Sequence, residues 1–305
     1  MYDTLGLWYN GAGLKLAPLL SNTIECRNDY NSFVLGKLGN LKVTLTEQGI
    51  KIQGSLSKWY LKNNIQTFTR IDVKNAIEAL SDTLKIPLEK ARITRMDIGH
   101  NFIMKYSPSA YFYYLGPSSR YRRSLTSSSL YYSNSLRTKL FYDKIAECKK
   151  SRSIVPNMLK NKNLLRFELR FMDKINKAFN SRELLVQILY DKLFFVNIVD
   201  KYVSEYISIN KLERIAFNKN VKLEPKDILN HLILQGISSL GGQNEVFELI
   251  EEARKKNQFK RAEYASRTKR MLTELYNNGI LIEPNELIKE LNDKVIALQS
   301  NYDLE

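Results

Sequence analysis

Cysteine and histidine are scarce in this chain of 305 residues, and both scarcities exclude classes of site. The two cysteines, Cys26 and Cys148, are too few for a disulfide framework or a thiolate zinc site, which fits a reducing cytoplasm. The two histidines, His100 and His231, lie far apart in the sequence and cannot form a closely spaced metal-binding pair. A metal ion would therefore be held mainly by carboxylates, which suit Mg²⁺ or Mn²⁺.

Long apolar runs and several common motifs are also missing. No apolar run reaches the length of about 18 residues that a membrane span needs. The N-terminal sequence MYDTLGLWYNG lacks a basic segment followed by an apolar one, so we expect no secretory signal. The sequence contains no G-x-x-x-x-G-K-[ST], no G-x-S-x-G and no H-E-x-x-H motif, so a nucleotide-hydrolysing P-loop and these two hydrolase classes are not indicated.

Positive charge and aromatic side chains are abundant. Lys and Arg number 47 against 32 Asp and Glu, which gives a net charge of +15 and a pI near 9.5. Such basicity favours a polyanionic partner, because each neutralised phosphate releases counterions. The 18 tyrosines and 13 phenylalanines offer flat faces on which unpaired bases can stack. The alternative is the codon bias of an AT-rich genome, which also enriches Lys, Asn, Ile and Tyr.

The first half of the chain has the pattern of an α+β domain. Short alternating segments at residues 2–9, 33–38, 41–46 and 49–56 predict strands of a meander. Asp72 is expected to cap an amphipathic helix that ends at Pro87, and Lys90–Phe102 predicts another strand. We therefore predict an antiparallel-sheet catalytic domain with packed helices over residues 1–175.

From Ser181 onward the sequence is almost wholly helical in pattern. We predict a helical DNA-binding or accessory domain over residues 176–305. The stretch 254–270 is its most basic part and is suited to a duplex backbone. A solvated helix face explains any one of these cations equally well.

The segment Ser127–Phe171 carries the side chains best suited to phosphodiester chemistry. If extended, it places Leu140, Tyr142 and Lys144 on one strand face. A second strand alternates a polar Arg166, Glu168 and Arg170 with apolar neighbours that would face the core. A tyrosine that attacks a phosphodiester needs a proton acceptor, a cation on the phosphate and help with the developing charge.

Asp97 is the second acidic residue that the pattern places in a strand interior, where aspartate is disfavoured. It would share a face with Arg95 and could lie beside Glu168 on a neighbouring strand. We expect Asp97 and Glu168, with Glu147 as a third ligand or base, to hold the divalent metal. The alternative is that these carboxylates form ion pairs with arginine or lysine at the sheet surface.

Two further segments predict DNA contacts. The segment Gly54–Arg70 carries Lys58 and Asn64 next to aromatic residues, and a strand ending in an Asn-rich turn explains it equally well. The segment Tyr106–Arg123 predicts a tyrosine-rich strand followed by a basic loop. Its three arginines are expected to contact phosphate: Arg120, Arg122 and Arg123.

Four short blocks, in this order, resemble the gene II replication proteins of filamentous phages and their phage and plasmid relatives. Gly54–Lys58 with Asn64 is similar to the family's Ser-Pro-x-Lys and Gly-His-Asn block, and Thr94–Asp97 to its Ser/Thr-Arg-Ile-Asp strand. Leu140–Glu147 resembles its Tyr-x-Lys-x-x-Glu block, and Leu165–Arg170 its Val-Arg-Phe-Glu-x-Arg block. Together the blocks cover roughly residues 50–175.

This resemblance implies a rolling-circle replication initiator that nicks and rejoins origin DNA through a 5′-phosphotyrosyl intermediate. It implies that Tyr142 is the nucleophile. Lys144, two residues further along the chain, is the expected catalytic cation that contacts the phosphate. Tyr131, in a block that resembles a segment of related plasmid initiators, is the reserve nucleophile. The family's glycine and histidine are Lys62 and Asn63 here, a departure within the loop that holds Asn64.

The remaining expectations concern DNA contacts, partners and alternatives. Arg95, Arg166 and Arg170 are expected to contact DNA together with Lys58, Asn64 and the three arginines of the basic loop. Origin DNA, single-stranded or extruded from a duplex, is the expected partner, and a host helicase is a further candidate. A relaxase, a tyrosine transposase and a non-enzymatic DNA-binding protein are the alternatives, and monomer and dimer stay equally open.

Overall fold

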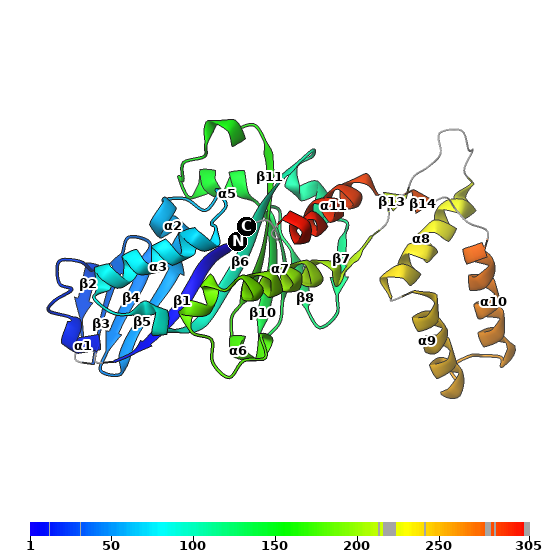
Figure 1. Cartoon of the computed structure of the whole chain (residues 1–305). Helices are drawn as coiled ribbons and strands as arrows, with labels where there is room; N and C mark the ends of the chain where they lie inside the picture. The colour runs from blue at the N-terminus through cyan, green and yellow to red at the C-terminus, as the bar shows by residue number, and fades with distance from the viewer. Residues whose placement is uncertain are drawn as a thin grey trace.

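The computed structural model describes residues 1–11, 13–30, 32–212, 214–215, 224–240, 242–277, 282–283 and 285–301. It shows an α+β protein in which a large antiparallel sheet with packed helices is followed by a mostly helical C-terminal region (Figure 1). Within these residues, no helix combines the length and the apolar content that crossing a bilayer requires.

One sheet of ten strands organises the molecule. Its spatial order is β2-β3-β4-β5-β1-β6-β11-β10-β9-β8, so β1 and β6 form its centre. All neighbouring strands run antiparallel. The strands are β1 (Tyr2–Asn10), β2 (Glu25–Asp29), β3 (Phe33–Leu38), β4 (Leu41–Thr46), β5 (Gly49–Ser55), β6 (Arg92–Met104), β8 (Arg122–Leu125), β9 (Ser129–Ser133), β10 (Arg137–Asp143) and β11 (Asn163–Phe171).

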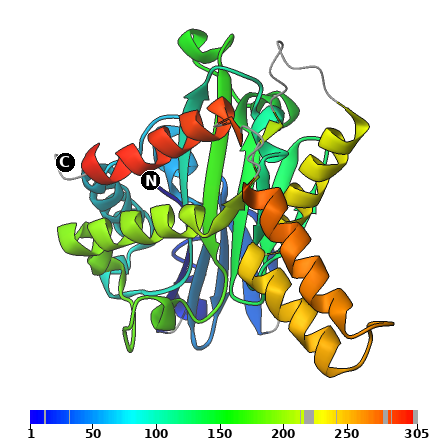
Figure 2. The ribbon, with the colours of Figure 1, turned by 90° about the vertical axis from the view of Figure 1, so that its right-hand side faces the viewer.

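Three long helices cover one face of this sheet: α3 (Arg70–Leu84), α7 (Lys192–Ile207) and α11 (Glu286–Asn301). Figure 2 shows them together on one side of the strands. The predicted amphipathic helix is α3, and its stripe of Val73, Ile77 and Leu80 is buried as expected. Its N-cap is Thr69 rather than Asp72, because Asp72 occupies the N3 position of a capping box and bonds back to the Thr69 amide.

Strict alternation along the strands separates a covered face from an open face. In β11, Leu165, Phe167 and Leu169 are fully buried beneath the helices, as predicted. The Phe167 ring stacks on Phe141 of β10 at 4.3 Å and contacts Tyr202 of α7 at 4.4 Å. The opposite face of the same strands carries polar side chains and is where the candidate site lies.

The buried core extends beyond the predicted boundary at residue 175. Residues of α7 and α11, among them Tyr202, Leu291 and Val295, belong to the same buried cluster as the sheet. Tyr206 of α7 donates a hydrogen bond of 2.6 Å to Asn292 Oδ1 of α11. The chain thus returns to the sheet after its helical segment, and the division into two functional domains stays a prediction.

Short elements connect and flank the sheet. They are α1 (Gly13–Leu16), α2 (Leu56–Leu61), η1 (Leu88–Lys90), α4 (Pro108–Phe112), α5 (Lys144–Lys150), η2 (Asn157–Leu159), α6 (Ile175–Ala178) and η3 (Val186–Tyr190). Two small antiparallel pairs join β7 (Leu115–Ser118) to β12 (Ile209–Lys211), and β13 (Arg214–Ile215) to β14 (Ile282–Glu283).

Three helices form a separate lobe at one end of the sheet, as Figures 1 and 2 show. They are α8 (Pro225–Ser239), α9 (Gln243–Lys255) and α10 (Glu263–Asn277). Lys269 of α10 bonds to Glu251 of α9 at 2.8 Å, so the most basic stretch of the sequence is partly paired with carboxylates of its own lobe.

One local prediction was wrong. The tyrosine-rich segment that begins at Tyr106 is not one strand followed by a loop, because Pro108 starts the helix α4, and the extended parts are β7 (Leu115–Ser118) and the start of β8 at Arg122. The region after Ser181 is mostly helical, as predicted. Its first two helices are separate elements, because η3 ends before Asp191, whose side chain caps α7 by accepting a bond from the Phe194 amide.

Candidate active site

Two irregularities in the pairing of β1 with β6 shape the open face at the sheet centre. The register shifts between Tyr2 and Leu5 and again between Gly6 and Leu7. Because Tyr2 and Leu5 are both buried in the core, the first shift turns Asp3 onto the open face. The second places Arg95 opposite Gly6 on that face.

A buried guanidinium group, that of Arg166, is the hub of the site. Its Nε donates to Glu168 Oε1 at 2.7 Å and its Nη2 to Asp3 Oδ2 at 2.7 Å. Its Nη1 donates to the Asn64 carbonyl at 3.2 Å and to Asn101 Oδ1 at 3.1 Å. With 3% of its surface exposed, Arg166 holds four segments of the chain together, and the predicted direct contact with DNA does not match this burial.

Gly99 makes room for this hub. It lies opposite Glu168 in the β6–β11 pairing, and a Cβ atom at this position would fall 2.5 Å from Arg166 Nη2. Any other residue would push the guanidinium group out of its hydrogen bonds. This glycine is therefore part of the site, although it carries no functional group.

The hydroxyl group of Tyr142, in β10, is connected to Arg166 through Glu168. The Tyr142 hydroxyl donates to Glu168 Oε1 at 2.8 Å, and Lys144 Nζ lies 5.9 Å from the centre of its ring. Burial raises the pKa of Tyr142 far above its usual value, and the charge of Glu168 adds to this while Arg166 opposes it. The phenol is thus protonated at rest, and its hydroxyl group is hydrogen-bonded to a carboxylate.

Glu168 is enclosed by two arginines. In addition to the bond from Arg166, Arg170 donates from Nε and Nη2 to Glu168 Oε2 at 3.0 and 2.7 Å. Burial alone would raise the pKa of Glu168, but the charges of Arg166 and Arg170 outweigh it and lower the pKa to about 2. Glu168 is therefore a stable anion at neutral pH.

Asp97 lies next to Glu168, as the pairing of the two strands was predicted to allow. It accepts a bidentate pair from Arg95 at 2.9 and 2.7 Å, and Arg170 Nε lies 3.8 Å from its Oδ2. Burial raises the pKa of Asp97, and Arg95 offsets only part of this shift. The Arg95–Asp97 ion pair that was the alternative to a metal ligand is thus present.

A second chain of bonds connects the hub to the start of α5. Asn64 donates to Asp3 Oδ2 at 3.2 Å and accepts a bond of 2.7 Å from Lys144 Nζ, which also bonds to Glu147 Oε2 at 2.6 Å. Lys58 Nζ lies 3.7 Å from Glu147 Oε1. Burial and the charge of Arg166 lower the pKa of Lys144, although Glu147 opposes this.

Lys144 does not lie on the strand face where the alternation placed it. Asp143 caps α5 by accepting a bond of 2.9 Å from the Ala146 amide, so the strand ends before Lys144. The helix turns Lys144 inward, where it is fully buried. The residue still reaches the site, but through Asn64 and Glu147.

A cavity of about 600 Å³ opens onto these groups. The predicted residues that line it are Tyr131, Tyr142, Asp97, Glu168, Glu147, Lys58, Asn64, Arg95 and Arg170. Lys144 and Arg166 bond directly to members of this wall. Residues from five separate stretches of sequence therefore converge on one cavity.

Tyr131, the reserve nucleophile, comes from β9. It lies opposite Leu140 in the β9–β10 pairing, and Ser129 lies opposite Tyr142. The two tyrosines are thus diagonal neighbours on the same face, a relation that separates Cα atoms by about 7–8 Å. Both line the cavity, and Tyr142 is the one whose hydroxyl group bonds to Glu168.

The three arginines of the predicted basic loop do not line this cavity. Arg123 faces the helix-covered side, where it donates to the carbonyl oxygens of Leu115 at 2.9 Å and Phe112 at 3.1 Å. A contact between Arg123 and phosphate would require both bonds to break. Arg120 and Arg122 are exposed.

Sequence reasoning missed Asp3, which bonds to four partners in the site. Beyond Arg166 and Asn64, its Oδ1 accepts bonds from the hydroxyl groups of Ser55 and of Ser57, the latter at 3.3 Å. The sequence offered one signal for Asp3: it is an acidic residue in a strand whose apolar and polar residues alternate only loosely. The bulge that turns it toward the site leaves no pattern in the sequence.

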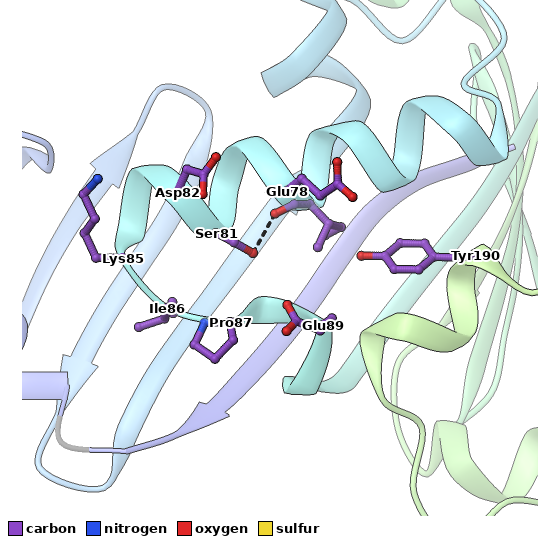
Figure 3. Close-up of a pocket in the computed structure, with 9 residues that line it drawn as sticks. Glu78, Ser81, Asp82, Lys85, Ile86, Pro87, Glu89 and Tyr190 are labelled. Atoms are coloured by element: carbon purple, nitrogen blue, oxygen red, sulfur yellow. Dashed lines mark hydrogen bonds between the residues drawn. The ribbon is translucent and has the colours of Figure 1, made fainter.

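Another cavity, of about 670 Å³, lies between α3, η1 and η3 and is shown in Figure 3. Glu78, Asp82, Glu89 and Tyr190 are among its lining residues. The bond drawn in it joins Ser81 to the Ile77 carbonyl and is internal to the helix. None of the candidate catalytic, metal-binding or DNA-binding residues lines this cavity.

The carboxylates do not fit a metal ion as they are arranged. Both oxygens of Asp97 and of Glu168 accept bonds from arginine side chains, and Glu147 is paired with Lys144. Among the described residues, no group of three or more His, Cys, Asp or Glu side chains is placed to hold a metal. We therefore assign no chemical step to a metal here.

Comparison with known proteins identifies the family. Residues 39–206, more than half of the chain, match the N-terminal region of the replication-associated gene II protein family. The chain belongs to this family. A search of curated proteins finds no match. The family is the one that the four sequence blocks resembled, and its matched range includes Asp97, Tyr142 and Glu168.

The structure accounts for one departure from the family's pattern. Lys62, which stands where the resembling block has glycine, adopts the left-handed conformation with a φ of +62° at the end of α2. Glycine reaches this conformation without strain, whereas lysine does so at some cost. Lys62 therefore preserves the turn that delivers Asn64 to the site.

Proposed function

We propose that this replication-initiator relative nicks and rejoins one strand of origin DNA, with Tyr142 as the nucleophile. The observation that carries the proposal is the hydrogen bond from the Tyr142 hydroxyl to Glu168, at the wall of a cavity that Arg95 and Arg170 also line. Family membership supports a role in phage-type replication initiation. A phenol, a proton acceptor and cations for phosphate are the groups that this reaction needs.

In the proposed step, the oxygen of Tyr142 forms a bond to phosphorus while the bond between phosphorus and the 3′ oxygen breaks, which leaves a 5′-phosphotyrosyl link. The phenol proton passes to Glu168, and the departing 3′ oxygen takes a proton from solvent to become a free 3′-OH. Arg95 and Arg170, partly exposed at the cavity wall, contact the non-bridging oxygens.

Within this proposal Lys144 and Arg166 are positioning residues. Arg166 fixes Glu168, and Lys144 fixes Asn64 and Glu147. Lys58, whose side chain is 31% exposed at the cavity wall, is placed to contact phosphate. The requirement for Mg²⁺ or Mn²⁺, recruitment of a host helicase and a cytoplasmic location stay predictions from the sequence.

A covalent-adduct assay tests the proposal. The full chain is incubated with labelled single-stranded candidate origin DNA in Mn²⁺, Mg²⁺ or EDTA and run on a denaturing protein gel. We expect a labelled adduct that Tyr142→Phe abolishes and Tyr131→Phe retains, and its loss in EDTA would establish the metal requirement.

Other outcomes of this assay are equally informative. An adduct lost only in Tyr131→Phe would move the nucleophile to the reserve tyrosine. DNA binding without an adduct, across several origins and metals, would favour the non-enzymatic alternative, in which the arginine–carboxylate pairs are purely structural.

A further inference from the structure

The open face of the sheet continues beyond the cavity across β6, β1, β5, β4 and β3. The strand pairing places side chains on it in rows that run perpendicular to the strands. One row joins Arg92, Trp8 and Lys51, which are successive cross-strand partners. The next row starts at Arg95, on the cavity wall, and crosses Gly6 and Gln53 to end at Lys42 and Lys37.

Trp8 is the aromatic centre of this surface. It lies on the opposite side of β1 from the buried Leu5 and Leu7 and is half-exposed, and its Nε1 donates to Asn10 Oδ1 at 2.6 Å. Its direct partners on the two neighbouring strands, Lys51 and Arg92, are exposed cations, and such partners have Cβ atoms about 5 Å apart. An indole between two cations suits a base with a phosphate on either side.

The cations of this surface lack the carboxylate partners that the cavity provides. Among the described residues, Lys37, Lys42, Lys51 and Arg92 have no carboxylate within 4.0 Å, whereas Arg95 is paired with Asp97. Glu25 lies opposite Lys37 at the outer edge of the sheet without pairing to it at this distance.

The like-charged pair Lys37 and Lys42 also indicates that this surface binds an anion. The two exposed lysines are direct cross-strand partners, an arrangement that destabilises a sheet unless an anion lies between them. The surface from the cavity to this pair spans four steps between strands, or about 19 Å. This length corresponds to roughly five stacked nucleotides.

We infer that this surface, defined by Trp8, Lys37, Lys42, Lys51 and Arg92, is a track for the unpaired DNA strand that flanks the cleaved phosphodiester. The inference rests on the proposed function for the identity of the strand, and it adds where the strand runs. A single strand is favoured over a duplex because stacking on Trp8 requires an exposed base face. The track is continuous with the cavity through Arg95.

Tryptophan fluorescence tests the track without any cleavage. The chain has two tryptophans, so Trp59→Phe leaves Trp8 as the sole tryptophan emitter. In this background, with Tyr142→Phe added and EDTA present, a 20-nucleotide thymidine strand is titrated at several salt concentrations. We expect quenching of Trp8 by the single strand and weak or no quenching by a duplex of the same length.

Substitutions measure the contribution of each group. Trp8→Ala should weaken binding of the thymidine strand about 5- to 150-fold, the range for one stacked base. The double variant Lys42→Gln/Lys51→Gln should reduce the salt slope by about 1.4, or about 0.7 for each cation. The matched control, Lys74→Gln/Lys85→Gln at exposed positions in and just after α3 on the covered side, should change neither quantity. The lysine variants keep the test valid if Trp8→Ala fails to fold.

Three results would overturn the track. The first is an unquenched Trp8 together with full affinity in the lysine double variant. The second is equal quenching by duplex and single strand, and the third is equal binding of a polyglutamate peptide with the same losses in the variants. Because the chemistry is disabled throughout, quenching without any adduct in the cleavage assay would keep the track and reject the proposed nicking.

Discussion

Two groups of buried charges lie on opposite faces of the same pair of strands, and only one of them borders the cavity of about 600 Å³. On the open face, Arg166 joins Glu168 and Asp3. On the covered face, Lys139 of β10 donates to the Ser118 and Ser208 hydroxyl groups and pairs with Glu205 of α7 at 2.9 Å. Both central cations are almost completely buried.

The difference between the groups lies in what surrounds them. The Lys139 group joins α7 and β7 to the sheet, and Arg137 also pairs with Glu205. None of its members lines the cavity of about 600 Å³. The Arg166 group borders that cavity together with the Tyr142 hydroxyl. A buried ion pair by itself is thus compatible with a purely structural role, and the cavity and the phenol are what favour chemistry.

The largest expected effect is a difference in the free energy of unfolding between a variant of the Arg166 group and a variant of the Lys139 group. Arg166→Met leaves Glu168 and Asp3 buried without their central cation, and loss of one partner of a buried pair typically costs about 3–5 kcal/mol. Lys139→Met leaves Glu205 paired with Arg137, so we expect a loss of only about 1–3 kcal/mol. Urea unfolding of both variants gives the two free energies, and equal losses would contradict the comparison.

The second prediction separates the groups by activity. In the proposed reaction Glu168 takes the Tyr142 proton, so Glu168→Gln should slow adduct formation by roughly 100-fold or more, the usual effect of a lost general base. Glu205→Gln is its match on the covered face and should leave the adduct rate within about twofold, because it does not touch the cavity. Similar losses in both variants would show that the rate reports only stability.

The third prediction is a pH dependence of stability. The folded-state pKa of Glu168 is about 2, below its unfolded value, so its contribution is present above the unfolded pKa and is lost as the pH falls toward 2. Glu168 alone loses about 2 kcal/mol of its contribution between pH 6 and pH 3, and the raised pKa of Asp97 acts in the opposite direction and reduces this loss. Urea midpoints between pH 6 and pH 3 measure it, and Glu168→Gln should flatten the dependence relative to the unsubstituted protein.

The sequence allowed the open face of the sheet centre to be predicted because strand alternation is local. Glu168 and its neighbours in β11 could be assigned to faces from their own order. Asp97 could be placed beside Glu168 once the two strands were taken as neighbours, and the β6–β11 pairing makes the two residues diagonal neighbours, since Asp97 lies opposite Arg170. The alternative ion pairs also proved real, since Arg95 and Arg170 enclose these carboxylates.

What the sequence did not reveal depends on interactions between distant residues or on single-residue irregularities. Asp3 reaches the site only because a bulge in β1 turns it, and Lys144 only because Asp143 starts a helix. Arg123 follows the exposed Arg122 in β8, yet it faces the helices because it pairs with the buried Tyr132. Local sequence patterns do not specify the bulge in β1, the start of α5 or the face on which Arg123 lies.

The smallest expected effect concerns one serine hydroxyl in the Arg166 group and one in the Lys139 group. Ser57 donates to Asp3 Oδ1 at 3.3 Å, and Ser118 accepts a bond of 3.0 Å from Lys139. Either serine replaced by alanine should cost about 0.5–1.5 kcal/mol, because each acceptor or donor keeps other partners. The two variants are therefore matched in stability, and their adduct rates isolate the role of the site.

We expect Ser57→Ala to slow adduct formation severalfold and Ser118→Ala to leave it unchanged. Asp3 shares Arg166 with Glu168, so a loosened Asp3 shifts the guanidinium group that orients the proton acceptor of Tyr142. Adduct time courses at a temperature where both variants are fully folded measure this effect. If Ser118→Ala slowed the reaction as much as Ser57→Ala, the two faces would be mechanically coupled, and the cavity alone could not define the functional group.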